Sequence, residues 1–225
     1  MESSLHRQLK AHYAPGEEFQ EVAFDGWRID AVRGRELIEI QHGSLAAIRD
    51  KVRRLLQRNH VRVVKPIVAR KTLVKLDARH GAEVSRRRSP KRGAILDLFD
   101  ELVYFTRIFP HPRLTLEVVL VEVEEHRYPG QGKRRRRRGD GREFVVQDQL
   151  LLDVGERQVF RTNRDLCRLL PRRLPQPFHT QHLAEKLQTP RHIAQRIAYC
   201  LRETGAIQLV GKQGNALLYR RGRAG

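Results

Sequence analysis

The stretch RIDAVRGRELIEIQHG, residues 28–43, carries two acidic residues in two short segments that alternate apolar and polar side chains. Such alternation is typical of half-buried β-strands, and a glycine between two of them favours a tight turn. We therefore predict a β-hairpin with Asp30 on its first strand and Glu39 on its second. Gln41 follows Glu39 by two residues, so the two side chains share a face of the strand.

The register of this hairpin decides which residue faces Asp30. A two-residue turn after Val32 sets Asp30 opposite Leu37, and a four-residue turn sets it opposite Glu39. In either register Asp30, Glu39 and Gln41 lie on one face, whereas a three-residue turn without a bulge would separate them. Adjacent carboxylates repel each other unless a proton or cation joins them, and a hard cation such as Mg²⁺ takes carboxylate oxygens. The hairpin therefore predicts a cation site.

The flanking segments complete an α/β pattern. Residues 4–13 predict a helix with an apolar stripe every fourth residue, and residues 44–59 predict a second helix that Ser44 caps. Three antiparallel strands are expected within residues 18–41, and two more at 60–70 and 72–77. The order is α-β-β-β-α-β, in which the second helix crosses over to a parallel strand.

The middle of the chain is expected to extend a basic surface. Residues 79–93 read as a linker, residues 93–109 as an amphipathic helix, and residues 114–128 and 144–154 as the two strands of a long hairpin. Six adjacent cations near the hairpin tip would bind phosphates without reading sequence. They are Lys133, Arg134, Arg135, Arg136, Arg137 and Arg138.

The last part of the chain predicts three helices followed by a small hairpin. The third helix, within residues 189–205, has Pro190 at its first position and Gly205 just past its end, as real helices often do. We divide the chain into residues 1–78, the α/β unit with the acidic pair, residues 79–156, the linker, helix and long hairpin, and residues 157–225, the C-terminal unit.

Composition points to a nucleic-acid partner. The 225 residues carry a net charge of +19, which favours binding to a polyanion. DNA is the expected partner, RNA is not excluded, and a homodimer is compatible with the sequence. Two cysteines, a polar beginning and the lack of a long apolar segment predict a cytoplasmic protein that does not enter a membrane.

Asp30, eight residues, then Glu39-Ile40-Gln41, with a helix on either side, resembles the PD-(D/E)xK superfamily of restriction-endonuclease-like nucleases. The resemblance covers about residues 1–77 and implies that Asp30 and Glu39 bind Mg²⁺, or Mn²⁺ in its place, with Glu2 as a third ligand. It implies hydrolysis of DNA phosphodiester bonds. Gln41 stands where the family has lysine, so it would orient water by hydrogen bonds, and Lys65, or alternatively Lys51, would supply the positive charge.

Residues 157–221 resemble a winged helix-turn-helix. The resemblance implies that the third helix reads DNA and that the hairpin contacts phosphate, since Arg and Gln form paired hydrogen bonds with base edges. The residues concerned are Arg191, Gln195, Arg196 and Tyr199 on the helix and Lys212 on the hairpin. Winged helices that bind RNA or protein are the alternative for this unit. For the whole chain, the alternative is a non-catalytic DNA-binding protein or transcriptional regulator that keeps a degenerate nuclease fold.

Overall fold

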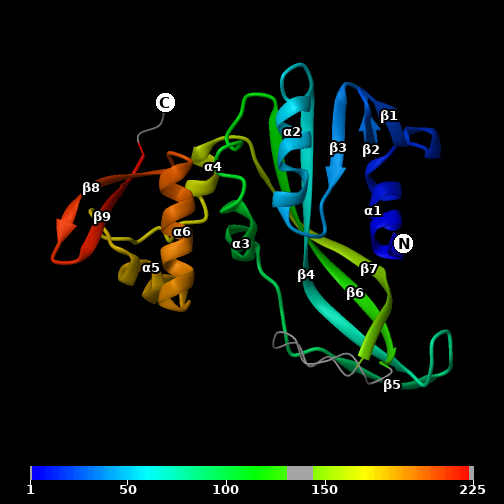
Figure 1. Cartoon of the computed structure of the whole chain (residues 1–225). Helices are drawn as coiled ribbons and strands as arrows, with labels where there is room; N and C mark the ends of the chain where they lie inside the picture. Colours follow the sequence, from blue (N-terminus) through cyan, green and yellow to red (C-terminus); the bar gives the residue numbers. More distant parts are fainter. Residues whose placement is uncertain (1, 131–143, 223–225) are drawn as a thin grey trace.

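The protein is an α/β structure built on one large mixed sheet, so the predicted α/β class is confirmed (Figure 1). The computed structural model describes residues 2–130 and 144–222. Its helices are α1 (Ser4–Tyr13), α2 (Arg49–Leu55), α3 (Leu98–Leu102), α4 (Asn163–Cys167), α5 (Thr180–Leu187) and α6 (Arg191–Glu203), with short 3₁₀ turns at Glu17–Phe19, Leu45–Ile48 and Ile95–Asp97. Its strands are β1 (Gln20–Phe24), β2 (Trp27–Arg33), β3 (Glu36–Ile40), β4 (His60–Leu76), β5 (Glu83–Arg88), β6 (Leu114–Pro129), β7 (Phe144–Phe160), β8 (Ile207–Gln213) and β9 (Ala216–Arg221).

The large sheet has the strand order β1-β2-β3-β4-β6-β7, and β5 pairs with the outer part of β4. Strand β2 is antiparallel to both β1 and β3, whereas β3, β4 and β6 run parallel and β7 is antiparallel to β6. The predicted order α-β-β-β-α-β is found as α1, β1, β2, β3, α2 and β4. As expected, α2 lies in the crossover that makes β4 parallel to β3.

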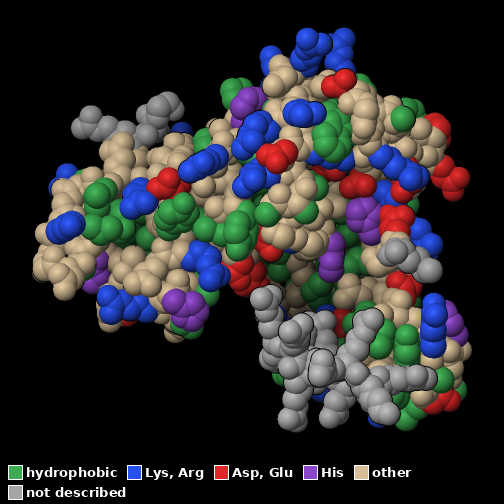
Figure 2. Space-filling model, viewed as in Figure 1, with side chains coloured by type: hydrophobic (Ala, Val, Ile, Leu, Met, Phe, Trp, Pro, Cys, Tyr) green, Lys and Arg blue, Asp and Glu red, His purple; other side chains and the backbone are tan. Residues whose placement is uncertain are grey.

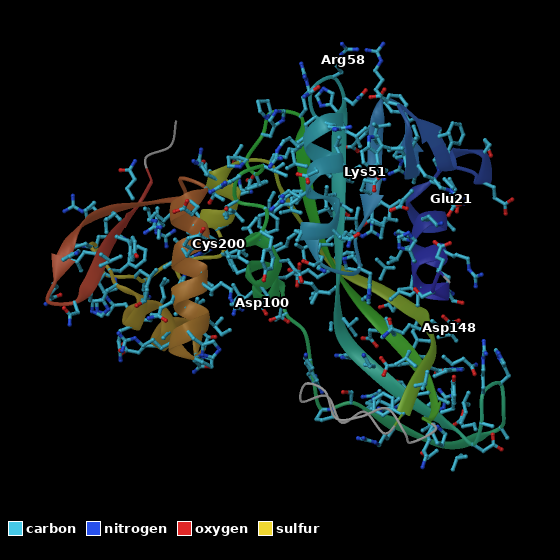
Figure 3. All side chains as sticks on the ribbon, viewed as in Figure 1. Glu21, Lys51, Arg58, Asp100, Asp148 and Cys200 are labelled. Carbon is cyan, nitrogen blue, oxygen red and sulfur yellow. The ribbon has the colours of Figure 1, made fainter. Side chains whose placement is uncertain are left out.

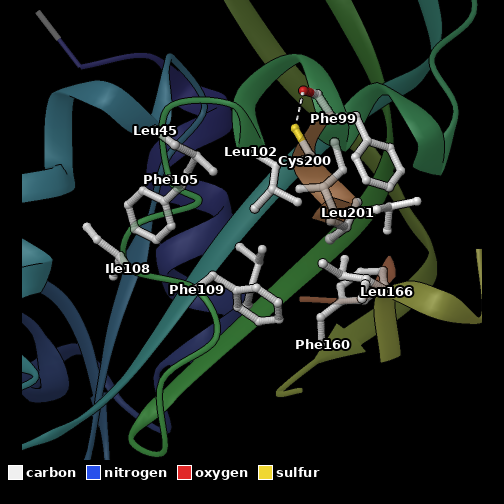
Figure 4. Packing of buried hydrophobic residues seen from close by; sticks show 14 of the residues in the cluster. Leu45, Phe99, Leu102, Phe105, Ile108, Phe109, Phe160, Leu166, Cys200 and Leu201 are labelled. Carbon is white, nitrogen blue, oxygen red and sulfur yellow. Dashed lines mark hydrogen bonds between the residues drawn. The ribbon is translucent and has the colours of Figure 1, made fainter. Parts of the chain in front are cut away.

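Each face of the sheet carries its own apolar core. Helix α1 covers one face through Leu5, Leu9 and Tyr13, which pack over Ala31, Ile38 and other buried residues of the sheet. The other face packs against α2, α3 and the C-terminal helices, where Phe99, Leu102, Phe160, Cys200 and Leu201 come together (Figure 4). Because each fully buried Leu or Phe contributes about 1.5–3 kcal/mol, these two layers fix how the helices sit on the sheet.

Two segments differ from the sequence-based expectation. Residues 60–76 form one continuous strand instead of two, and residues 79–93, expected as a linker, contain β5. All six residues of β5 are exposed, so its sequence carries no alternation that could reveal a strand. Pairing of Thr72 with Arg88 and of Val74 with Arg86 along β4 holds β5 in place. Tertiary hydrogen bonding has therefore overridden the local signal.

The amphipathic helix expected over residues 93–109 is much shorter. It consists of the turn Ile95–Asp97 and the five residues of α3, after which isolated turns bury Phe105, Ile108 and Phe109. Those turns are closed by single hydrogen bonds, such as that from the Phe109 amide to the Phe105 carbonyl. The apolar spacing that predicted a long helix is satisfied by these turns because they bury the same side chains.

Strands from both sides of the predicted boundary at residue 78 belong to the same sheet, since β6 pairs with β4 over most of its length. Beyond the helices, the outer ends of β4, β6 and β7 continue with β5 as an extension at the bottom of Figure 1. We call this extension the arm and define it as residues 70–88, 122–130 and 144–152. The C-terminal unit of α4, α5, α6 and the β8–β9 sheet lies at the left of Figure 1, apart from the arm.

Candidate functional site

The hairpin of β2 and β3 has the register that brings the two acids together. Val32 pairs with Leu37, which is the register of the four-residue turn after Val32, and within that turn Arg33 pairs with Glu36 around Gly34, whose φ is +58°. Continuing this register by one residue sets Asp30 opposite Glu39. On the other side, pairs of β1 with β2 flank Asp30 and set Glu21 opposite it. Three acids therefore form a row across three adjacent strands.

Asp30 sits where the pairing of β2 with β3 opens. The Ile40 amide donates a hydrogen bond to Asp30 Oδ2 (2.7 Å), and His6 Nε2 of α1 lies 3.2 Å from Oδ1. Ile29 packs in the α2-side core and Ala31 in the α1-side core, so the alternation of β2 is interrupted at Asp30. Burial alone would raise the pKa of Asp30, but the bonds from His6 and Ile40 and the charge of Lys51 hold that pKa below its usual value. Asp30 is therefore ionised at neutral pH.

Glu39 is the more unusual carboxyl group. Its residue is only 3% exposed, and burial raises the pKa of Glu39 to about 7 against the opposing effect of Lys51. Lys51 Nζ lies 2.6 Å from Oε1 and also donates to the Arg28 carbonyl at 2.5 Å. Within the described residues, Glu39 Oε1 is the one buried side-chain oxygen or nitrogen without a hydrogen-bond partner. The contact with Lys51 is thus an ion pair that leaves this oxygen with unused acceptor capacity.

Helix α1 and its preceding turn present a polar stripe to the acids. Glu2 Oε1 lies 3.5 Å from His6 Nε2 and 2.6 Å from Lys10 Nζ. These three residues are spaced four apart in the sequence and form one polar network. Lys10 is only 3% exposed and also pairs with Glu21. Glu21 has a φ of +52°, a strained value for a residue other than glycine. Its carboxylate pairs with Arg28 as well, and Figure 3 shows Glu21 near one end of α1 and Lys51 on α2.

Gln41 and Lys65, both expected to place water, are bound to the loop that follows β3. Gln41 Nε2 donates to the Ser44 carbonyl at 2.9 Å. Lys65 Nζ donates to the carbonyls of His42 (2.9 Å) and Gly43 (2.5 Å). The cation next to Glu39 is Lys51, the alternative that the sequence had offered. The positive charge beside Glu39 therefore comes from Lys51 of α2 and not from Lys65 of β4.

The sequence-based prediction of the site did not include several residues of this network. His6 and Lys10 follow Glu2 at intervals of four, and this helical spacing could have revealed them. Glu21 could have been found by extending the Asp25-Gly26 hairpin, which sets it opposite Asp30. Across residues 2–130 and 144–222, no group of three or more His, Cys, Asp or Glu side chains is arranged as a ready metal site.

The C-terminal unit exposes most of the predicted reading residues. Arg191, Gln195 and Tyr199 follow one exposed stripe of α6, and Lys212 is exposed on β8. Arg196 instead forms an ion pair with Asp100 of α3, which Figure 3 shows beside α6. On the face seen in Figure 2, Lys and Arg side chains are spread over this unit and over the end of α2. The predicted phosphate contacts Lys133, Arg134, Arg135, Arg136, Arg137 and Arg138 lie outside the described residues.

Together the fold and the site define a mixed α/β protein with a partly buried acidic row, flanked by lysine and histidine, at the β2–β3 hairpin. The chain belongs to the family described as "Domain of unknown function (DUF8091)", whose profile matches residues 3–161. It is 28% identical over 221 residues to an uncharacterized protein of Treponema pallidum (strain Nichols), which covers 98% of this chain and 85% of that relative. No solved structure matches the chain.

The family match includes Asp30, Glu39 and Lys51 and every strand of the large sheet, and it ends just before α4. The family match therefore spans the whole of the large sheet. None of the helices within the described residues is long and apolar enough to cross a membrane.

Proposed function

We propose that this protein is a metal-dependent, endonuclease-like phosphodiesterase that acts on DNA, with a PD-(D/E)xK-type core in its first 78 residues. The observation that carries the proposal is the pair of neighbouring carboxyl groups: Glu39, whose residue is only 3% exposed, lies in the strand position opposite Asp30. Two neighbouring carboxylates repel each other unless a proton or a cation joins them, so a divalent cation would stabilise the pair.

The donor set fits a hard divalent cation. Asp30 and Glu39 would hold Mg²⁺ or Mn²⁺, with Glu2 as the third carboxylate, because such ions prefer carboxylate and water oxygens. When bound, the ion would lower the pKa of a water molecule and neutralise charge on the phosphate. Ion binding also requires Glu39 to be deprotonated, which its pKa of about 7 allows in neutral to alkaline solution.

The remaining side chains would position these groups. His6 and the Ile40 amide hold the Asp30 carboxylate in one orientation and keep it ionised. Lys51 brings a positive charge next to Glu39, the kind of charge that the lysine of the E-x-K motif provides, where it would attract the phosphate. Gln41 would act indirectly, by fixing the loop after β3 through its bond to Ser44.

We further propose that the C-terminal unit is a winged helix-turn-helix that anchors DNA. Arg191, Gln195 and Tyr199 present donors and an aromatic ring along one exposed stripe of α6, and Lys212 extends from β8. The net charge of +19 supports binding to a polyanion.

The second candidate is a DNA-binding protein without catalysis, and one observation favours it. His6 approaches Asp30 from α1, on one face of the sheet, whereas Lys51 approaches Glu39 from α2, on the other face. Lys51 already neutralises part of the acidic row and His6 bonds to Asp30, so the network can stand as a structural feature without a metal ion.

A cleavage assay separates the two candidates. Labelled single-stranded, duplex and branched DNA is incubated with Mg²⁺ and with the parent, Asp30→Ala or Asp50→Ala, the last an exposed acid on α2 that serves as the matched control. The proposal predicts cleavage by the parent and by Asp50→Ala, and a loss of about 100-fold or more in Asp30→Ala. Equal cleavage by all three would refute the site, and DNA binding without cleavage in all three would favour the second candidate.

A further inference from the structure

The far end of the arm contains a hollow of about 330 Å³ that combines positive charge with aromatic surface. Lys75 of β4, Arg87 of β5 and Arg127 of β6 contribute three cations to its lining. Tyr128, Phe144 and the buried Leu73 contribute apolar surface. Its volume lies at the lower end of the range for small-ligand sites, so it is large enough for one compact planar group.

The three cations of the hollow are available to a ligand. Several other cations of the arm are paired, for example Lys71 with Glu125 and Arg86 with Glu124. Lys75, Arg87 and Arg127, by contrast, have no carboxylate within ion-pair distance among the residues that the structure describes, and the hollow itself is lined by no acid. Three cations that have no carboxylate partner in the described part of the chain, gathered around one hollow, favour an anionic ligand such as phosphate.

The register of β5 explains why Arg87 differs from its neighbours. Arg87 pairs with Leu73 of β4, whereas Arg86 pairs with Val74 and Arg88 with Thr72. Because successive side chains of a strand point to opposite faces, Arg87 turns toward the hollow while Arg86 and Arg88 turn to the other side of the sheet. The run of three arginines thus serves two different surfaces.

The aromatic part of the hollow suits a planar ligand. The Arg127 guanidinium lies 4.3 Å from the centroid of the Phe144 ring, so a cation and an aromatic face are already stacked there. Phe144 is only partly buried. Nucleobases stack on both aromatic rings and arginine planes, and their phosphates bind cations.

We propose that this hollow binds an unpaired nucleotide of single-stranded DNA, with its phosphate on Lys75 and Arg87 and its base against Phe144 and Arg127. A duplex keeps its bases stacked inside the helix and presents only its backbone to such a site. The inference rests on the proposed DNA partner, but it does not require that the acidic row cleaves anything. It assigns to the arm the recognition of a single-stranded region or end.

The test is a binding titration by fluorescence anisotropy in EDTA, with labelled oligo-dT of about 20 nucleotides and a blunt duplex of the same length. The full chain is compared with Arg87→Gln, Phe144→Leu and Arg58→Gln. Arg58 is an exposed arginine just after α2, at the opposite end of the molecule from the arm (Figure 3), so it matches the charge loss of Arg87→Gln. All variants keep residues 131–143 unchanged.

We expect Arg87→Gln and Phe144→Leu each to raise the Kd for oligo-dT by about fivefold or more and to change the Kd for the duplex much less. Arg58→Gln should leave the preference between the two DNAs unchanged. Equal effects of Arg87→Gln and Arg58→Gln would overturn the proposal, as would equal losses for single strand and duplex. Because no metal is present, a failure of cleavage would leave this result untouched, and a failure here would leave the cleavage assay untouched.

Discussion

Replacement of Glu39 by glutamine is expected to stabilise the protein at about pH 8 and to leave its stability at about pH 4.5 nearly unchanged. Glu39 is buried beside Asp30, and its pKa is raised from 4.5 to about 7. Glutamine resembles the protonated carboxyl group in shape and charge, so the variant behaves at every pH like the parent at low pH.

The magnitude follows from the two pKa values. Between 4.5 and about 7 the folded state keeps a proton that the unfolded state has lost, so the free energy of unfolding falls as pH rises. The contribution is fully present below pH 4.5 and is lost as pH rises through about 7. At about 1.4 kcal/mol per pH unit over about 2.5 pH units (7 minus 4.5), the parent loses about 3.5 kcal/mol that Glu39→Gln retains.

Urea unfolding in EDTA at several pH values measures this difference directly. Other groups titrate as well, among them His42, whose pKa burial lowers. They occur in both proteins, so the difference between the two unfolding curves isolates Glu39. A gap that grows by about 3.5 kcal/mol from acid to alkaline solution is expected. A gap that stays constant with pH would refute the conclusion that Glu39 is buried with a raised pKa.

Three further outcomes are expected. Lys65→Met should lower the free energy of unfolding by about 2–3 kcal/mol in urea, because two loop carbonyls lose a buried donor. Tyr13→Phe should lower it by about 1.5–3 kcal/mol in the same assay, because the phenol donates to the buried Glu117 carboxylate at 2.6 Å. Gln195→Ala, on the exposed stripe of α6, should leave the free energy of unfolding unchanged. In an anisotropy titration it should raise the Kd for a preferred duplex by about fivefold or more. An unchanged Kd would argue against base reading by α6.

The sheet around the acids could be predicted because its signals are local. Alternation in residues 20–41, the glycines of two tight turns and the apolar stripe of α1 are all set by neighbours within a few residues. The same pattern predicted that Asp30 would lie opposite Glu39 in one of two registers, and that register is the one found. The α2 crossover then followed from chain geometry.

The details that depend on distant contacts could not be predicted. Strand β5 exists because β4 extends far enough to pair with it, although its own residues are all exposed. Whether Lys51 or Lys65 approaches Glu39 depends on how α2 rotates after the turn at Leu45–Ile48, which packing decides. Arg196 looked like a base reader, but Asp100, almost a hundred residues away, binds it.

Binding of Mn²⁺, followed by electron paramagnetic resonance at about pH 8, tests most directly whether Asp30 and Glu39 share a divalent cation. The parent and Asp50→Ala are expected to bind one ion per chain, and Glu39→Gln and Asp30→Ala to bind it at least about tenfold more weakly. Mg²⁺ should displace the bound Mn²⁺. Equal Mn²⁺ affinity in the parent and in Glu39→Gln would contradict the account, because the acidic row would then not be the metal site.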